Sequence, residues 1–495
     1  MGLTAESLVK KERFMPKGVL YINLIQTFST VGFAVLLGTL NLYLQSRNMP
    51  LSNVNTLVAS FFALNFLLHF LGGSLGGSLL SYRGMFTMSI LLQMGGLIGI
   101  ASSDLNIILA GMALFITGSG LNVSCINMML IQLFKANDSR RRVAFSINYS
   151  CMNLGFIIGF AIGGYFQQYN DYTSGFFTAT GCLALCVIFL ALAWPYLKDK
   201  STYYSETFCK SPMRFVGVPL VMIVCFLLSL FLMHHADIGS MLIYIAFALI
   251  LVAMLYMAFT SDYAYRGKIL SFLVLSATSM IFAFVQGLQS TGLANFIKYN
   301  TNLNIFGVTF QQSTVNSFES LGVIIFGLFF ALYLQYQRKN NKVVSSEKTI
   351  CRGLGIMVIS FLMIPLGIYF QGENGHVQLI FPALLLFITA ASEIQVNSTT
   401  YALPGELGKP KHQGLFTGYL FLNVAMGINL SGPISNAILG NVNNISEVSP
   451  VETDPMYFKA FIILAVVSGF IAITYLFLGK PIKKLMTRQN AAAYA

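Results

Sequence analysis

Two carboxylic acids lie inside long apolar stretches of the sequence. Glu319 lies in FQQSTVNSFESLGVIIFG and Glu393 in ITAASEIQVNSTTYALP, whereas the other acids fall in predicted loops and tails. No Lys or Arg lies deep in an apolar stretch to neutralise them. Because hydrocarbon disfavours a charged carboxylate, we expect each group to bind a proton near neutral pH or to neutralise a cationic group of a substrate.

Small polar side chains accompany both acids along the chain. Those that carry amide or hydroxyl groups are Asn316, Ser317, Ser320, Ser392, Gln395 and Asn397. These neighbouring polar side chains favour a water-filled cavity over a core without water. The alternative is that each carboxyl stays protonated and hydrogen-bonds a neighbouring Ser or Asn without a functional role.

One histidine, His69, lies inside a predicted membrane span. An imidazole ionises near neutral pH, so His69 could relay protons. The alternative, more frequent for a single histidine in an apolar segment, is a packing group that hydrogen-bonds in the core. No nucleophile–base pair, metal-ligand cluster or phosphate loop stands out, so neither an enzyme nor a metal or cofactor is predicted.

The elements that must position these groups are membrane helices. Hydrophobic residues make up 56% of the chain and charged residues 9%, which excludes a soluble fold. Apolar runs of about 20 residues cross a bilayer. Fourteen such runs are predicted, at 18–46, 53–80, 84–102, 106–134, 144–168, 174–197, 213–234, 238–260, 268–297, 312–336, 353–371, 377–404, 414–440 and 456–479.

The positions of the basic residues give the expected orientation. If the N-terminus is cytoplasmic, every Lys and Arg except Arg47, Lys298 and Lys459 falls on the cytoplasmic side. Both termini are therefore predicted to be cytoplasmic, in a bacterial-type inner membrane. The net charge of +12 is explained by these loops and by anionic lipids, so no nucleic-acid partner is expected.

The fourteen spans fit an all-α major facilitator fold of two six-helix halves with an inserted helix pair. The predicted domains are residues 1–197, the inserted pair and its linkers at 198–262, and residues 263–495. The basic turn around Arg83 follows glycine pairs after the second span. The segment Gln337-Arg338-Lys339 is a similar basic turn after the corresponding span of the second half. Transporters built from such repeats bind substrate near the membrane midplane, between the halves.

The sequence also resembles a known family. From residue 118, GSGLNVSCINMMLIQLFKANDSRRRVAFSINYSCMNLG resembles the signature of the proton-coupled oligopeptide transporter family, which is called POT or PTR. The segment that contains Glu393, SEIQVNSTTYALPGELGKPKHQGLFTGYLFLNVAMGINLSG, is similar to the penultimate helix pair of that family. The resemblance implies a divergent member with alternating access and proton-coupled uptake.

The resemblance assigns expected roles to further residues. Glu319 and Glu393 would bind protons and a substrate amine, with Asn316 and Gln395 beside them. The opposite wall of the cavity would be lined by Gln26, Thr27, Thr30, Tyr149 and Asn153. The loops expected to take part in gating carry Arg83, Asp138, Arg140 and Arg141.

Departures from the family pattern bear on the substrate. The Glu-x-x-Glu-Arg motif of the first span is replaced by Asn23-Leu24-Ile25-Gln26-Thr27, and a lysine of the fourth span falls at Val123. A neutral amide of the tenth span has become Glu319, and the acidic motif of the ninth span is unmatched around Gln286. The cations that would hold a peptide carboxylate are therefore missing, so we expect an amine substrate with no free carboxylate, or with a masked one.

Two other functions stay open at this point. The same fold could import or export another small molecule, such as a siderophore, an amino acid, an amine or a drug. A non-transporting sensor is the second alternative, and short tails argue against it. The expected partners are the substrate, protons and the lipid bilayer, and the chain is predicted to be monomeric.

Overall fold

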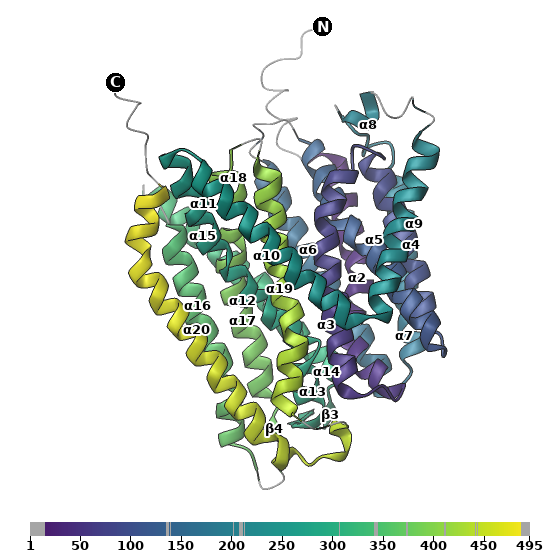
Figure 1. The fold of residues 1–495 in the computed structure, drawn as a ribbon. Coiled ribbons are helices and arrows are strands. Elements are labelled where there is room, and N and C mark those ends of the chain that lie inside the picture. The colour runs from purple at the N-terminus through teal and green to yellow at the C-terminus, as the bar shows by residue number, and fades with distance from the viewer. Residues whose placement is uncertain are drawn as a thin grey trace. The chain divides into compact units, whose positions relative to one another are not determined.

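The structure is a computed structural model of the chain (Figure 1). It describes residues 15–134, 138, 140–200, 202–206, 211, 213–305, 307–340, 345–372, 375–409, 412–440, 442 and 444–486, but not the side chains of 70–74, 142, 214, 215 and 338. Within these ranges, 14 helical segments are long and apolar enough to cross a membrane, which confirms the predicted number. The parts of the predicted cytoplasmic tails at 1–14 and 487–495 lie outside the described residues.

The first half of the chain forms six long helices and one short one. They are α2 (Lys17–Ser46), α3 (Leu51–Leu75), α4 (Tyr82–Ile100), α5 (Leu105–Gln132), α6 (Arg140–Gln168), α7 (Tyr172–Ala193) and the short α8 (Tyr203–Glu206). The predicted inserted pair follows as α9 (Arg214–His234) and α10 (Ala236–Thr260).

The second half is more broken than the apolar runs predict. Its helices are α11 (Tyr263–Ser276), α12 (Thr278–Gln289), α13 (Gly292–Tyr299), α14 (Gln312–Val315), α15 (Ser317–Lys339), α16 (Ser346–Tyr369), α17 (Ile380–Thr400), α18 (Leu403–Leu407), α19 (Gln413–Leu439), η3 (Ile445–Glu447) and α20 (Pro450–Met486). Four two-residue strands lie between them: β1 (Thr301–Asn302), β2 (Asn304–Ile305), β3 (Val308–Thr309) and β4 (Val377–Gln378). β1 pairs in parallel with β4, and β2 pairs antiparallel with β3.

The predicted span 268–297 is three helices rather than one. Hydroxyl side chains at its breaks hydrogen-bond backward to main-chain carbonyls: Thr278 Oγ1 donates to Leu275 O at 2.6 Å, and Thr291 Oγ1 donates to Gly287 O at 2.9 Å. Such side-chain bonds compete with the helical ladder and bend helices. As a result, Gln289 ends α12 instead of lying in mid-helix.

The packing of the chain defines two compact units. Unit 1 contains Met1–Ala34, Leu68–Gly159 and Thr173–Phe231. Unit 2 contains Val35–Leu67, Phe160–Tyr172 and Leu232–Ala495, so it includes the second part of α2, the first part of α3 and the end of α6 together with α10 to α20. The three-part division predicted at 1–197, 198–262 and 263–495 follows the sequence repeats rather than packing, and it stays a prediction.

Unit 2 is held by apolar packing around α16. This helix lies beside α17 and α20, and α20 runs along it in Figure 1. Phe361 of α16 meets Phe461 of α20 with ring centroids 6.1 Å apart, and Phe296 of α13 meets Tyr457 at 4.9 Å. Buried aromatic pairs of this kind contribute roughly 0.5–1.5 kcal/mol beyond their buried area.

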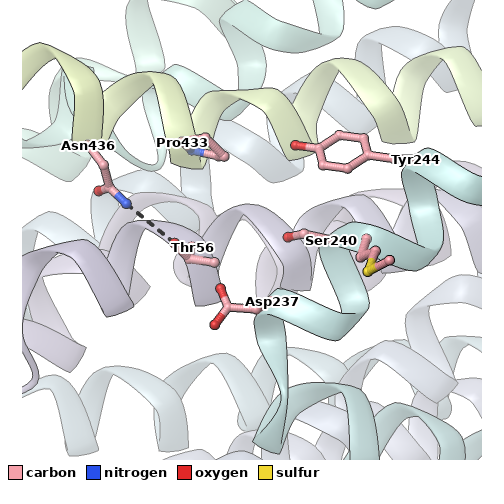
Figure 2. A pocket seen from close by; sticks show the side chains of 7 residues that line it. Thr56, Asp237, Ser240, Tyr244, Pro433 and Asn436 are labelled. Atoms are coloured by element: carbon pink, nitrogen blue, oxygen red, sulfur yellow. Dashed lines mark hydrogen bonds between the residues drawn. The ribbon is translucent and has the colours of Figure 1, made fainter.

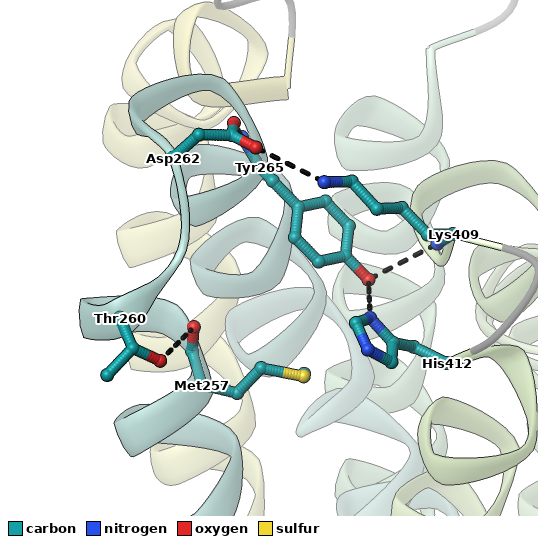
Figure 3. Close-up of polar contacts among 6 residues, drawn as sticks. All are labelled: Met257, Thr260, Asp262, Tyr265, Lys409 and His412. Carbon is teal, nitrogen blue, oxygen red and sulfur yellow. Dashed lines mark hydrogen bonds and ion pairs between the residues drawn. The ribbon is translucent and has the colours of Figure 1, made fainter.

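A polar cluster ties the start of α11 to the segment between α18 and α19 (Figure 3). Lys409 Nζ lies 3.1 Å from Asp262 Oδ2 and 4.2 Å from the centre of the Tyr265 ring. The Tyr265 hydroxyl lies 2.9 Å from His412 Nδ1 and accepts a hydrogen bond from Lys409 N. Both ionic side chains are more than 40% exposed, so this ion pair contributes little to stability.

Candidate functional site

Glu319 is buried in the first turn of α15. Its side chain is 8% exposed, and its Oε2 accepts a hydrogen bond of 2.5 Å from Gln289 Nε2 at the end of α12. The other carboxyl oxygen, Oε1, has no hydrogen-bond partner among the described residues. The group therefore has one neutral donor and one free oxygen, and no described Lys or Arg makes an ion pair with it.

Buried amides without partners surround this acid in the sequence. Gln312 and Asn316 are both 0% exposed. In each residue, the amide nitrogen and the amide oxygen of the side chain both lack a hydrogen-bond partner in the described ranges. The same holds for Gln289 Oε1 and Ser317 Oγ. Unpaired buried polar groups are costly, so these atoms indicate a place where water or a polar ligand completes the hydrogen bonds.

The local fold explains why these groups share one face. Gln312, Asn316 and Glu319 follow one another at the four- and three-residue spacing that places side chains on the same side of a helix. Ser313 lies on a different face: its hydroxyl donates to Phe160 O at 3.2 Å, and its N–H donates to Gln167 Oε1 at 3.1 Å. These two bonds fix α14 against the end of α6.

Glu393 is the second buried acid of unit 2, in α17, with 7% exposure. A Cβ on Gly322 would lie 2.8 Å from Ala390 Cβ, and one on Gly327 would lie 3.6 Å from Ile394 Cδ1, so α15 and α17 run side by side in parallel. This register places Glu319 and Glu393 about seven residues apart along the helices, which is about 10 Å. Their backbone positions are therefore about two helical turns apart along the helices.

The other predicted residues of unit 2 lie near these acids in the sequence but differ in their bonding. Gln395 is half-buried, and its Nε2 donates to Ala391 O at 3.2 Å within α17. Ser392 is 0% exposed, and its Oγ has no partner in the described part of the chain. Unit 2 thus brings Glu319 into contact with Gln289, an amide that the sequence did not single out, while Asn316 and Gln312, which was also missed, precede Glu319 in the chain.

The predicted cavity residues of α2 lie in unit 1 and bond mainly to their own helix. Gln26 Nε2 donates to Thr30 Oγ1 at 3.3 Å, and Thr30 Oγ1 donates to Gln26 O at 2.8 Å. Thr27 Oγ1 lies 3.1 Å from both Asn23 O and Cys151 O, so it links α2 to α6. Gln26, Thr27 and Thr30 are all at most 8% exposed and uncharged.

α6 supplies the remaining predicted wall residues of unit 1. Asn153 is 5% exposed and donates to Tyr149 O at 3.0 Å, whereas Tyr149 is 37% exposed. Gly155 lets the two helices approach closely, since a Cβ there would lie 2.3 Å from Thr27 O. These residues are thus placed by a tight α2–α6 contact, and they present no positive charge.

His69 is buried in α3 of unit 1, with 5% exposure. Its carbonyl accepts a hydrogen bond of 3.1 Å from Ser124 Oγ of α5. The relay role stays a prediction, and the contact with α5 is what a packing role requires.

The predicted gating residues lie at helix starts in unit 1. Asp138 precedes α6 and binds Arg140, with Oδ2 2.6 Å from Nη2 and Oδ1 3.0 Å from the Arg140 backbone N. Arg141 lies in the first turn of the same helix and is half-buried. Arg83 Nη1 donates to Trp194 O at 2.7 Å, and its guanidinium lies 4.3 Å from the centre of the Trp194 ring.

An acid that the sequence did not single out holds the loop before α4. The backbone N–H of Tyr82 lies 3.1 Å from both carboxyl oxygens of Asp199. Gly77 turns the same loop with φ of 75°, which favours glycine, and its carbonyl accepts from Tyr204 N at 2.9 Å. Burial raises the pKa of the Asp199 carboxyl, while the hydrogen bonds from Tyr82 and Thr202 and the Arg83 charge act in the opposite direction.

Within the described residues, no group of His, Cys, Asp and Glu side chains is arranged to hold a metal ion. The candidate site is therefore built from carboxyls, amides and hydroxyls. These groups can bind protons, ammonium groups and polar neutral groups. Gln289 and Gln312 could have been found in the sequence as amides inside apolar runs, but nothing there pairs Gln289 with Glu319.

Comparison with known proteins gives consistent matches. The model of the POT family matches residues 75–448. The dipeptide and tripeptide permeases A of Cronobacter turicensis and of Escherichia coli K12 are each 22% identical, over 98% and 96% of this chain and 96% and 94% of their own lengths. The permease A of Erwinia pyrifoliae is 24% identical over 96% of both chains.

Solved structures agree on the fold. A bacterial homologue of the human drug peptide transporters PepT1 and PepT2 matches with a TM-score of 0.81 at 14% identity, over 95% of this chain and 99% of its own. A peptide transporter POT in complex with sulfate matches with a TM-score of 0.79 at 20% identity, over 96% of both chains. The predicted major facilitator fold is confirmed, and because the family model covers most of the sequence, this chain is a multi-pass membrane transporter that belongs to the POT family.

Proposed function

We propose that this protein is a proton-driven secondary transporter that works by alternating access. Glu319 and Glu393 bind protons and the amine of the substrate. Its substrate carries an amine and has no free carboxylate, or has a masked one. The proposal departs from the dipeptides and tripeptides named for its relatives.

The observation that carries the proposal is the bonding of Glu319. The carboxyl is buried with one neutral donor, Gln289, and its second oxygen is free of described partners. A buried carboxyl without a cation is stable when it is protonated or when an ammonium group lies beside it. With Glu319 beside the ammonium group of the substrate and a proton on Glu393, both are carried in the same direction, as symport requires.

The nearby amides supply the rest of the recognition. Gln312 and Asn316 each offer a carbonyl oxygen and an NH₂ group that no described residue occupies. Substrate amide or hydroxyl groups would satisfy them. An ordinary peptide could use the same amides, so the amides alone do not decide the substrate class.

The neutral polar residues of unit 1 support a substrate without a free carboxylate. Gln26, Thr27 and Thr30 carry no charge; Thr27 and Thr30 donate to main-chain carbonyls, and Gln26 donates to the Thr30 hydroxyl. A carboxylate bound without a cation or free donors would lose its hydration, at a cost of roughly a few kcal/mol. Val123, at the position of the family lysine, is 37% exposed and apolar.

Uptake by proteoliposomes tests the function. We expect an inward proton gradient to drive uptake of a carboxylate-free amine, and we expect Glu393→Gln to abolish the response to the gradient. Glu406→Gln, at an exposed acid of α18, is the matched control and should leave uptake unchanged. Uptake that ignores the gradient in the wild type would exclude proton coupling.

A transporter of another small molecule, such as a siderophore, an amino acid or a drug, is the second candidate. The free amides around Glu319 favour it, because they accept many polar groups. Binding that persists in Glu319→Gln and Glu393→Gln variants would select this candidate, since neither carboxyl would then contact the ligand.

The predicted placement in the cell completes the proposal. We infer an inner membrane with both termini in the cytoplasm from the distribution of Lys and Arg. The relay role of His69, the gating role of the Arg83 and Arg140 loops and the monomeric state are proposed with it. Labelling of single cysteines placed beside Arg47 and beside Lys339 with a membrane-impermeant reagent in intact cells tests the orientation: only the first should react.

A further inference from the structure

A pocket with both polar and apolar side chains in its lining lies in unit 2, and neither Glu319 nor Glu393 lines it (Figure 2). Its volume is about 420 Å³, and it lies between α3, α10 and α19. The residues that line it are Thr56, Asp237, Ser240, Met241, Tyr244, Pro433 and Asn436. In Figure 2 the side chains of Asp237, Thr56 and Asn436 lie on one side of the pocket, and the ring of Tyr244 lies on the other.

The pocket opens on a helix whose outer face is apolar. Met241 is 60% exposed, Leu249 66% and Val252 63%, so α10 has the surface of a lipid-facing span. Asp237 lies in its first turn, at the end that the charge distribution predicts to be outside. The pocket therefore lies where lipid headgroups meet the hydrocarbon.

The lining favours a cation. Asp237 is the one acidic residue among the seven, and no described Lys or Arg makes an ion pair with it. Three donors of the lining already have acceptors: Asn436 Nδ2 donates to Ser52 O and to Thr56 Oγ1, Thr56 Oγ1 donates to Ser52 O, and Ser240 Oγ donates to Asn429 Oδ1. The carboxyl oxygens of Asp237 remain to accept hydrogen bonds, and the hydroxyl oxygens of Thr56 and Tyr244 lie in the same lining, which suits a ligand rich in N–H donors.

We propose that this pocket binds a primary ammonium group carried by a lipid headgroup. A primary ammonium has three donors and fits carboxylate and hydroxyl oxygens. A quaternary ammonium is recognised by several aromatic faces, and the lining has one ring, that of Tyr244. The site is separate from the proposed transport site, and its test does not depend on transport.

Binding there would join three helices. Asn436 also accepts from Asn55 Nδ2 at 2.9 Å, and Asn55 Oδ1 accepts from Asn41 Nδ2 at 3.1 Å, so the pocket adjoins a buried chain of amides that links α2, α3 and α19. A headgroup held by Asp237 and Thr56 bridges α10 to α3. The bound lipid therefore stabilises unit 2.

Thermal unfolding of the purified, delipidated full chain tests the proposal. Phosphatidylethanolamine should raise the midpoint by about 2–4 °C, while phosphatidylcholine and phosphatidylglycerol with the same acyl chains should raise it less. Asp237→Asn should lose the selective shift. Glu452→Gln, at an exposed acid in the first turn of α20, is the control and should keep it.

The outcomes separate the possible sources of the ligand. Equal shifts with all three lipids, or an unchanged shift in Asp237→Asn, would overturn the proposal. A shift produced by soluble ethanolamine or phosphoethanolamine without lipid, and lost in Asp237→Asn, would confirm the ammonium site and overturn the lipid as its source.

Discussion

The polar residues of unit 1 and unit 2 differ in how completely they are bonded. In unit 1, Gln26, Thr27 and Thr30 are neutral and bond to one another or to carbonyls of α2 and α6. In unit 2, Glu319 and the buried amides Gln312 and Asn316 leave oxygen and nitrogen atoms without described partners. A ligand gains little from groups that are already bonded, so we infer that recognition is concentrated in unit 2.

Removal of the Glu319 carboxylate should have the largest effect on the affinity for an amine ligand. A charge-assisted hydrogen bond contributes about 1.5–3 kcal/mol, so Glu319→Gln should weaken binding of an amine ligand about 10–100-fold. Titration calorimetry on the purified protein measures this. The double variant Gln289→Glu/Glu319→Gln exchanges the acid and the amide across the same hydrogen bond and should recover part of the affinity; no recovery would mean that the position of the acid, and not its presence, is what matters.

A cation added to unit 1 should give that unit a partner for a ligand carboxylate. Val123→Lys places an ammonium at a position that is 37% exposed and so tolerates a longer side chain. We expect it to strengthen binding of ligands with a free carboxylate by about 1 kcal/mol, or roughly fivefold. Val143→Lys, on the more exposed face of α6, is the control. Equal gains in both variants would show a general charge effect.

The loop acid of unit 1 should matter for stability and little for binding. Asp199→Ala removes both acceptors of the Tyr82 N–H and should cost about 1 kcal/mol in the free energy of unfolding. Asp199→Asn keeps an acceptor and should cost less. Thermal unfolding of the two variants at pH 7 compares them.

The pH dependence of Asp199 has a definite sign. Because burial raises the pKa of this carboxyl, the folded state holds its proton more tightly than the unfolded state does. Its contribution to stability is therefore present below the ordinary carboxyl pKa and is lost as the pH rises through the raised value. The stability of Asp199→Asn relative to wild type should thus fall as the pH is lowered from 7; a rise would contradict the assigned direction.

Substitutions of the hydrogen-bonded polar residues of α2 should have the smallest effect on ligand affinity. Gln26→Ala and Thr30→Val each remove a neutral hydrogen bond within α2 and should alter amine affinity by about 0.5 kcal/mol or less. The same calorimetric titration applies. A tenfold loss of amine affinity in either variant would show that residues of unit 1 bind the ligand, and it would contradict the inference that recognition is concentrated in unit 2.

The sequence was sufficient for the features that depend on composition. Fourteen apolar runs predicted the fourteen candidate spans, and the two acids inside those runs are both buried. These features follow from the free-energy cost of placing charged groups and unpaired backbone groups in hydrocarbon. Each segment avoids that cost through its own composition and its own helical hydrogen bonds, so no contact with a distant segment needs to be known.

The sequence could not predict features that depend on contacts between distant segments. The hydrogen bond of Gln289 with Glu319 requires the break after α12 and the packing of α15, and Asp199 reaches the Tyr82 N–H across more than a hundred residues. The breaks themselves depend on which hydroxyls bond backward to carbonyls, as Thr278 and Thr291 do. Other Ser and Thr residues in apolar runs make the same bond within continuous helices, as Thr39 does in α2.

One binding measurement tests the central claim most directly. A dipeptide and the same dipeptide amidated at its C-terminus differ only in the carboxylate, so their effects on thermal unfolding can be compared in the wild type and in Glu319→Gln. We expect the amidated ligand alone to stabilise the wild type, and Glu319→Gln to lose that shift. Stronger stabilisation by the free dipeptide would contradict the account, because it would require a carboxylate partner that the neutral residues of unit 1 do not provide.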